Sequence, residues 1–172
     1  NKADISLPDG FGLILAARLF GKKLKRLTGS DTTPKILKLA EEKGKKVMIL
    51  NRSDGLSSPE EIKESISKKF PKLDFQILNV SRDKHLSSDN LEKINYYGPA
   101  IIFSTLGFPY QEKQIYHNLN KIPSLKLAIG VGGSFDYLSG KINRGPKIFR
   151  RLGLEWFWRL INAFNYKNSG KR

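Results

Sequence analysis

Short apolar runs alternate with segments of helical apolar spacing along most of this chain, and that alternation limits its possible folds more than any other feature. The clearest apolar runs lie at 47–50, 75–80, 100–105 and 125–129, with helical patterns between them. Such alternation is typical of βα units, in which helices cover both faces of a mostly parallel sheet. The sequence therefore predicts an α/β protein with a Rossmann-like, mostly parallel sheet flanked by helices.

Local signals mark where several helices begin and end. Residues 58–61 read Ser-Pro-Glu-Glu, a capping box with proline at the first helical position, and predict a helix to about residue 69. Thr33 before Pro34 predicts a second helix start, and Gly44 predicts its end. Further strands are expected at 4–7 and 24–27, and further helices at 11–20, 89–97 and 109–120.

Charge is the strongest compositional signal. The chain has 31 Lys+Arg against 16 Asp+Glu, a formal net charge of +15. Such an excess favours polyanionic partners such as nucleic acid, anionic lipid or phosphorylated ligands. Basic residues are concentrated after residue 141, where they alternate with aromatic residues. We therefore expect an α/β domain at 1–153 and a helical, basic and aromatic C-terminal appendage at 154–172.

Composition also excludes several kinds of site. The chain has no cysteine, so disulfides and thiolate metal sites are excluded, which fits a reducing cytoplasm. The chain has only two histidines, His85 and His117, and each stands alone in the sequence, which argues against a histidine metal cluster and against Ser-His-Asp catalysis. No metal and no cofactor are expected. No apolar run reaches the ~18 residues that a membrane-spanning helix needs.

Ligands of open α/β sheets bind beyond the carboxyl ends of the strands. Residues 9–10, 28–31, 107–112 and 130–133 follow expected strands. These segments combine glycines, which let a ligand approach the backbone, with helix N-termini that favour phosphate and with a few carboxylates and amides. Together they predict one ligand site.

Each segment also has an ordinary structural interpretation. Asp9 and Asp31 precede expected helices, where aspartate commonly serves as the N-cap. Gln111 and Glu112 fall in a first helical turn, which suits the helix dipole whatever the function. The aromatic residues around Trp156 pack in a core more often than they bind a ligand. No single segment therefore identifies a function.

The motifs are far more specific when they are taken in chain order. The chain carries Pro-Asp-Gly at 8–10, Thr-Gly-x-Asp at 28–31, Leu-Gly-x-Pro-x-Gln-Glu at 106–112, Gly-Val-Gly-x-x-Phe-Asp at 130–136 and Gly-Leu-Glu-Trp at 153–156. With this combination, the chain resembles the WecG/TagA/CpsF glycosyltransferases of teichoic acid, enterobacterial common antigen and capsule synthesis, from residue 1 to about residue 160.

The resemblance implies an inverting, metal-independent transferase. It implies a UDP-sugar donor of the N-acetylmannosamine type and a polyprenyl-diphosphate-linked N-acetylglucosamine as acceptor. It also implies a cytoplasmic protein that is peripheral on the inner face of the cytoplasmic membrane and contacts anionic lipid. The chain has no Asp-x-Asp sequence, a common metal-binding signature of other nucleotide-sugar transferases, and this absence agrees with the implied metal independence. No nucleic-acid partner is expected, and an oligomer is compatible with the sequence.

By the same resemblance, Asp9 is expected to be the catalytic base and Gln111 to contact the donor. The other residues expected to bind substrate come from the matching motifs, a nearby arginine and the basic tail. They are Arg26, Thr28, Gly29, Asp31, Glu112, Gly130, Gly132, Phe135, Asp136, Arg150, Arg151 and Arg159.

The chain also departs from the family pattern. Family members usually have a strand and a helix before this start, so we expect part of the domain to be lacking here. The glycine-rich loop that usually follows the third strand reads Asn-Arg-Ser-Asp-Gly at 51–55, and the sequence after residue 160 differs from the family's ending. Two alternatives stay open at this point: a basic nucleic-acid-binding α/β module and an inactive transferase fragment.

Overall fold

The computed structural model describes residues 3–83, 85–143, 145–146 and 149. The chain divides into two compact units. The larger spans Gly29–Ile142, and the smaller contains Ala3–Thr28 and the described residues from Asn143 onward. The expected boundary at residue 153 and the expected C-terminal helices lie outside the described residues.

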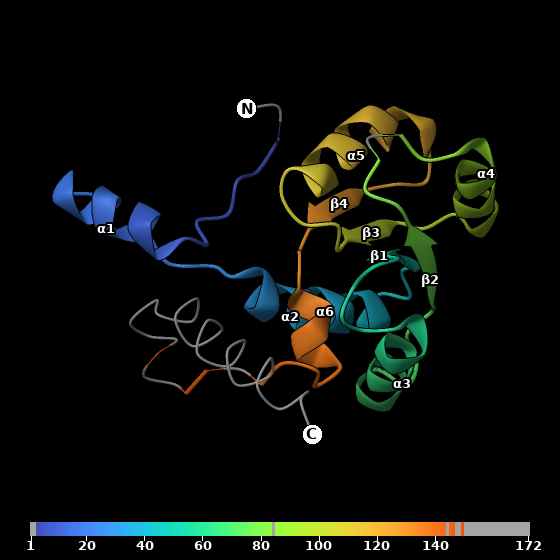
Figure 1. Cartoon of the computed structure of the whole chain (residues 1–172), viewed down its shortest axis with the longest axis horizontal. Helices are drawn as coiled ribbons and strands as arrows, with labels where there is room; N and C mark the ends of the chain where they lie inside the picture. Colours follow the sequence, from blue (N-terminus) through green and yellow to red (C-terminus); the bar gives the residue numbers. More distant parts are fainter. Residues whose placement is uncertain (1–2, 84, 144, 147–148, 150–172) are drawn as a thin grey trace, which may run out of the picture. The chain divides into compact units, whose positions relative to one another are not determined.

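A four-stranded, all-parallel sheet forms the centre of the larger unit (Figure 1). The strands are β1 (Val47–Arg52), β2 (Phe75–Val80), β3 (Ile101–Ser104) and β4 (Leu127–Gly130), in the order β2-β1-β3-β4. The chain moves from β1 outward to β2 and then returns to place β3 on the other side of β1. The order therefore reverses between β1 and β3, the place where open α/β sheets bind ligands.

Helices cover both faces of this sheet (Figure 1). On one face lie α2 (Gly29–Glu42), α3 (Pro59–Lys69) and α6 (Ser134–Leu138). On the other face lie α4 (Ser88–Tyr97), α5 (Tyr110–Asn118) and the short 3-10 helix η1 (Leu119–Lys121). The α/β prediction is confirmed, because parallel strands here are joined through helices on both faces.

The alternation of side chains along β1 explains why there are two cores. Val47 and Ile49 point to the first face and pack in a cluster with Leu37 of α2 and Ile62 of α3. Met48 and Leu50 point to the opposite face, into a second cluster. Each of these four β1 side chains is at most 2% exposed, and burying one contributes roughly 1.5–3 kcal/mol.

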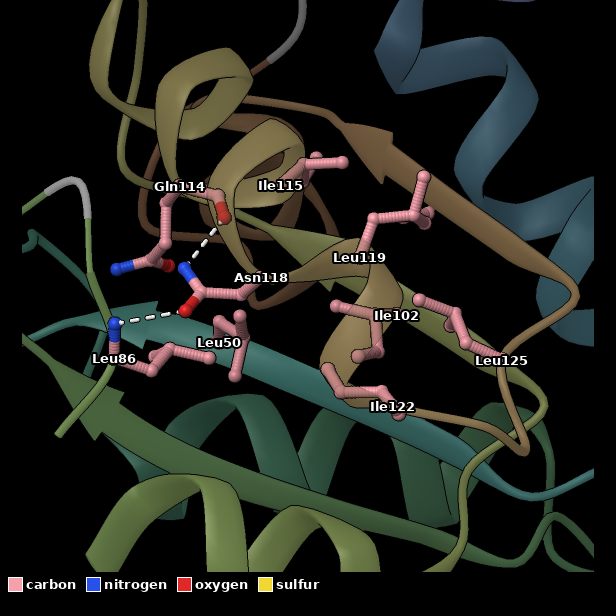
Figure 2. Close-up of a pocket in the computed structure, with 10 residues that line it drawn as sticks. Leu50, Leu86, Ile102, Gln114, Ile115, Asn118, Leu119, Ile122 and Leu125 are labelled. Carbon is pink, nitrogen blue, oxygen red and sulfur yellow. Dashed lines mark hydrogen bonds between the residues drawn. The ribbon is translucent and has the colours of Figure 1, made fainter. Parts of the chain in front are cut away.

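The second core contains a small cavity beneath α5, which Figure 2 shows with its lining residues. Its volume is about 10 Å³, so it holds one water molecule at most. Asn118 Nδ2 donates to the carbonyl oxygen of Gln114 at 2.7 Å, and Asn118 Oδ1 accepts from the amide of Leu86 at 3.3 Å. The first bond lies within α5, and the second ties α5 to the segment that leads into α4, so this cavity is a packing feature.

Two helix predictions had different outcomes. The capping box of α3 is confirmed: Ser58 Oγ accepts from the Glu61 amide at 3.3 Å, and the Glu61 carboxylate accepts from the Ser58 amide at 2.9 Å. The expected start of α2 at Pro34 is wrong, because the helix already begins at Gly29. Thr33 is a buried residue inside the helix rather than its N-cap. Gly44, with φ of +57°, follows the helix end as expected.

The smaller unit contains α1 (Phe11–Leu19), which confirms the helix expected at 11–20. The strands expected at 4–7 and 24–27 are wrong, since neither segment is extended into a sheet. The Leu27 amide donates to the Pro8 carbonyl oxygen at 3.0 Å, but this is a single hydrogen bond and not the regular series that pairs two strands. Short apolar runs become strands only where a neighbouring strand supplies a series of backbone partners. Among the described residues, no helix is long and apolar enough to cross a bilayer.

Candidate functional site

Gln111 joins the two loops that follow β3 and β4. It is the second residue of α5, and its side chain is largely buried. Its Oε1 atom accepts from the amide of Gly107 at 3.2 Å and from the amide of Gly132 at 3.0 Å. Two segments that the sequence predicted to meet, 107–112 and 130–133, therefore do meet at the carboxyl edge of the sheet.

Gly130 leaves room for the Gln111 side chain. A Cβ atom at this position would lie 2.5 Å from Gln111 Nε2 and 2.6 Å from its carboxamide carbon, closer than side chains pack. The Gln111 side chain thus passes directly over the backbone at the end of β4. Gly130 thus allows a close approach to the backbone, as the sequence predicted, but the group that approaches is the Gln111 side chain and not a ligand.

The other end of the Gln111 carboxamide orients a carboxylate. Gln111 Nε2 donates to Glu112 Oε1 at 2.8 Å, and Glu112 is exposed. The oxygen of Gln111 and the amide of Gly132 are both engaged by protein groups. Gln111 and Glu112 therefore offer a ligand two groups at this edge. These are the exposed Glu112 carboxylate and the second N–H of the Gln111 carboxamide.

The start of α2 lies against the same β4–α6 loop. A Cβ atom at Gly29 would lie 2.9 Å from Ser134 Oγ and 3.4 Å from the Val131 carbonyl oxygen, so the loop and the helix start touch through a glycine. Asp31 is exposed in the first turn of α2, where a carboxylate suits the helix dipole. The structure therefore brings Gly29 next to the segment that contains Gly130 and Gly132.

Asp136 and Phe135 of α6 have different surroundings. Asp136 is half-buried, and its Oδ1 atom accepts from Ser57 Oγ at 2.7 Å. Phe135 is 1% exposed and packs edge-to-face on Phe103, with ring centroids 5.7 Å apart. This burial favours a packing role for the Phe135 side chain, and substrate binding by either residue stays a prediction.

Asp9 and Arg26 lie together in the smaller unit. Arg26 Nε donates to the Asp9 carbonyl oxygen at 2.7 Å, and its terminal nitrogen lies 3.6 Å from Asp9 Oδ1. The N-cap of α1 is Gly10, without a side-chain capping bond, so Asp9 does not occupy the capping position. Its side chain is 57% exposed. Thr28, also in this unit, is buried. Arg150, Arg151 and Arg159 lie outside the described residues.

Sequence reasoning missed the polar residues at the end of β1. Asn51 Nδ2 donates to Asn79 Oδ1 at 3.1 Å, and the Arg52 amide donates to Thr105 Oγ1 at 3.0 Å. These bonds link the ends of β1, β2 and β3, next to the point where the strand order reverses. The sequence carried only part of this signal: Asn51 and Arg52 directly follow an apolar run, whereas Asn79 and Thr105 fall inside the runs expected at 75–80 and 100–105.

An open groove of about 500 Å³ follows β2. Ser81, Asp83, His85, Asn90 and Gln114 are among the residues that line it. Its volume is that of an ordinary small-molecule pocket, and its hydroxyl, carboxylate and amide groups suit a ligand rich in hydrogen-bonding groups. In the described part of the chain, no three His, Asp or Glu side chains are grouped so that they would hold a metal ion.

Comparison with known proteins gives a consistent result. Residues 1–165 match the model of the glycosyl transferase WecG/TagA/CpsF family. A Bacillus subtilis protein named N-acetylglucosaminyldiphosphoundecaprenol N-acetyl-beta-D-mannosaminyltransferase is 32% identical over 97% of this chain and 64% of its own length. A Bacillus spizizenii protein of the same name is 33% identical over 94% of the chain and 62% of its own length.

A Staphylococcus aureus protein with that name is 29% identical over 99% of the chain and 65% of its own length. The chain thus spans slightly less than two thirds of the curated relatives that it matches. The resemblance inferred from the motifs is confirmed.

Proposed function

The chain belongs to the WecG/TagA/CpsF glycosyltransferase family, and from this premise we propose that it transfers an N-acetylmannosamine-type sugar from UDP to polyprenyl-diphosphate-linked N-acetylglucosamine. The observation that carries the proposal is the family match over residues 1–165. The names of the relatives support the sugar and the acceptor. The glycine-rich loops gathered around Gln111, at the edge where α/β proteins bind ligands, support a nucleotide-sugar donor.

In the proposed reaction Asp9 is the general base. Its carboxylate takes the proton of the acceptor hydroxyl as that oxygen attacks the anomeric carbon of the donor. The bond between the anomeric carbon and the UDP oxygen breaks on the opposite face, UDP leaves with the bonding electrons, and the configuration inverts. An exposed Asp9 side chain that does not occupy the helix-capping position supports this role.

The departing UDP is stabilised without a metal ion in this proposal. Backbone amides and cationic side chains such as Arg26, Arg150 and Arg151 would carry the developing charge. A lipid-linked acceptor and a net charge of +15 support attachment to the inner face of an anionic membrane, to which each basic residue near the surface contributes about 1 kcal/mol.

A transfer assay tests the function. The chain is incubated with a panel of UDP-sugars and a lipid-diphosphate N-acetylglucosamine acceptor, and the product is identified by mass. The Bacillus subtilis relative is assayed in parallel to prove that the acceptor and the detection work. We expect a product one N-acetylhexosamine heavier than the acceptor. No product from this chain, in a preparation that is folded by circular dichroism while the relative turns over, contradicts the proposal.

A further inference from the structure

Two arginines share one carboxylate at the carboxyl edge of the sheet. Arg52 Nε lies 3.0 Å from Asp54 Oδ1, and a terminal nitrogen of Arg82 lies 3.5 Å from Asp54 Oδ2. The Arg82 guanidinium also lies over the ring of Tyr110, 5.6 Å from its centroid. We call Arg52, Asp54, Arg82 and Tyr110 the arginine cluster. Among its members, only Tyr110 lies in a segment that the sequence predicted to bind a ligand, 107–112.

The backbone holds the cluster in place. The Arg52 amide donates to Thr105 Oγ1, and the Ser53 amide extends the ladder to the Val80 carbonyl oxygen at 3.1 Å. The Gly55 amide then returns to the Arg52 carbonyl oxygen at 2.9 Å, which closes a tight turn. A Cβ at Gly55 would lie 2.9 Å from that oxygen, so the turn needs glycine. Arg52 thus stands on the central strand, and Asp54 is turned back toward it.

The cluster lies where three strands end. Arg52 closes β1, Arg82 comes two residues after the end of β2, and Tyr110 begins the nine-residue helix α5 that follows β3. This is the position beside the reversal of strand order where α/β sheets bind ligands. Ser81 and Asp83, the sequence neighbours of Arg82, line the groove of about 500 Å³.

The charges of the cluster are unbalanced in favour of an anion. Two guanidinium groups face a single carboxylate, which leaves one positive charge. The Asp54 side chain is 65% exposed, against 27% for Arg52 and 40% for Arg82. Exposed ion pairs contribute only about 0–1 kcal/mol, so little free energy is lost when such a carboxylate is displaced. A diphosphate carries more negative charge and offers paired oxygens that match guanidinium geometry.

We propose that Arg52 and Arg82 form a diphosphate-binding site in which the ligand replaces Asp54 as their shared partner. The exposed ring of Tyr110 borders the site and offers a surface for an apolar or aromatic group attached to the diphosphate. The inference rests on the proposed function for its source of ligand, because both proposed substrates, the nucleotide sugar and the lipid-linked acceptor, carry a diphosphate. The site chemistry is the same for both.

Calorimetric titration of the chain tests the site without any transfer reaction. The probes are inorganic pyrophosphate for the shared chemistry, UDP for the nucleotide source and farnesyl diphosphate below its micelle concentration for the lipid source. Arg52→Gln and Arg82→Gln are each expected to weaken pyrophosphate binding about tenfold, as expected when a charge-assisted hydrogen bond is lost. Asp54→Asn is expected to tighten it severalfold, because the competing carboxylate is gone.

Lys93→Gln is the matched control, since Lys93 also pairs with a carboxylate, that of Asp89 at 2.7 Å, but on α4. It should leave all three affinities unchanged. Whichever of UDP and farnesyl diphosphate gains more affinity in Asp54→Asn identifies the source of the diphosphate as nucleotide or lipid. A gain with either of these two probes supports the site. Unchanged pyrophosphate affinity in both arginine variants, or weaker binding in Asp54→Asn, overturns it. If the arginine variants fail to fold, Asp54→Asn still decides.

The result is separable from that of the transfer assay. Pyrophosphate binding that depends on Arg52 and Arg82, in a chain that transfers no sugar, overturns the proposed function and supports the site. Sugar transfer with pyrophosphate binding that is indifferent to both arginines supports the function and overturns the site.

Discussion

Asp9 is the residue on which the proposed chemistry depends most directly. Asp9→Asn keeps the size and polarity of the side chain but removes its basicity. General base catalysis typically contributes ~10²- to 10⁴-fold, so turnover should fall by that order while UDP-sugar affinity changes little. The measurement is steady-state transfer together with donor affinity and melting temperature.

A structural role for Asp9 gives a different result. The N-cap of α1 is Gly10, so the structural alternative for the Asp9 side chain is its ion pair with Arg26. An exposed ion pair contributes only about 0–1 kcal/mol, so a purely structural role leaves turnover almost unchanged. Near-normal turnover in Asp9→Asn therefore contradicts the base assignment. Asp9→Asn keeps the hydrogen bond from Arg26 to the Asp9 carbonyl oxygen, so the variant removes the carboxylate without removing this backbone contact.

Gly130 and Gln111 should be coupled. Gly130→Ala introduces a Cβ into the space of the Gln111 side chain and should cost roughly 1–3 kcal/mol of unfolding free energy, as overpacking does. Gln111→Ala removes the acceptor of two amides and should cost about 1–3 kcal/mol. In the double variant the overpacking disappears, so the two costs should not add. Urea unfolding of the four proteins measures this, and strict additivity would refute the contact.

The sequence identified Gln111 by its motif but gave no indication of its contacts. The hydrogen bond from the Gly132 amide joins two residues that are 21 apart in the sequence, and no local pattern encodes such a tertiary contact. Phe135 was likewise found by its motif, yet its 1% exposure depends on how α6 packs on β3. The motifs thus predicted which residues matter, while only the fold determined what each one touches.

At the scale of single elements, prediction succeeded where local chemistry decides the outcome. Helix α3 follows from its capping box, because Ser58 and Glu61 satisfy each other's backbone partners within four residues. Helix α2 was misread, because Thr33-Pro34 also fits the middle of a helix. Pro34 there lacks the donor to the Ser30 carbonyl oxygen and its ring crowds that carbonyl, while Leu37 on the same helix is fully buried in the core.

The end of α4 should make the protein sensitive to alkaline pH. Burial raises the pKa of Tyr97 well above its ordinary value near 10, as does its hydrogen bond to Asp74 Oδ1 at 2.8 Å. Above about pH 10 the unfolded chain releases this proton and the folded chain keeps it, so stability falls as pH rises, by at most about 1.4 kcal/mol per pH unit. Below pH 10 the contribution is fully present.

Tyr97→Phe separates this tyrosine from the other groups that titrate there. We expect the variant to lose stability less steeply than the wild type between pH 10 and 11.5 in urea unfolding. Equal slopes for the two proteins would show that Tyr97 does not keep its proton in the folded state.

At the scale of the whole molecule, the alternation of apolar runs was sufficient to predict the α/β class. It could not predict the order β2-β1-β3-β4, because the side of β1 on which a strand adds depends on nonlocal packing. The strands expected at 4–7 and 24–27 failed for a related reason. The apolar residues of both segments match a strand pattern. Both segments lie in the smaller unit, however, whose described residues form no strand with which they could pair.

Chelation tests the metal-independent character of the whole reaction. If amides and cationic side chains stabilise the departing UDP, turnover should survive millimolar EDTA with little change. The rate is measured before and after chelation, with Mg²⁺ and Mn²⁺ added back separately. Complete loss of turnover that either ion restores would contradict this part of the proposal.

The central position of β1 has a consequence for how the protein opens. Its backbone is paired on both sides, and its side chains at 47–50 are buried on both faces. Amide protons of β1 should therefore exchange with deuterium only through global unfolding, whereas those of the edge strands β2 and β4 escape through local fraying. In native-state exchange the slowest protons should map to β1. Arg52, the last residue of β1, then belongs to the strand that opens last.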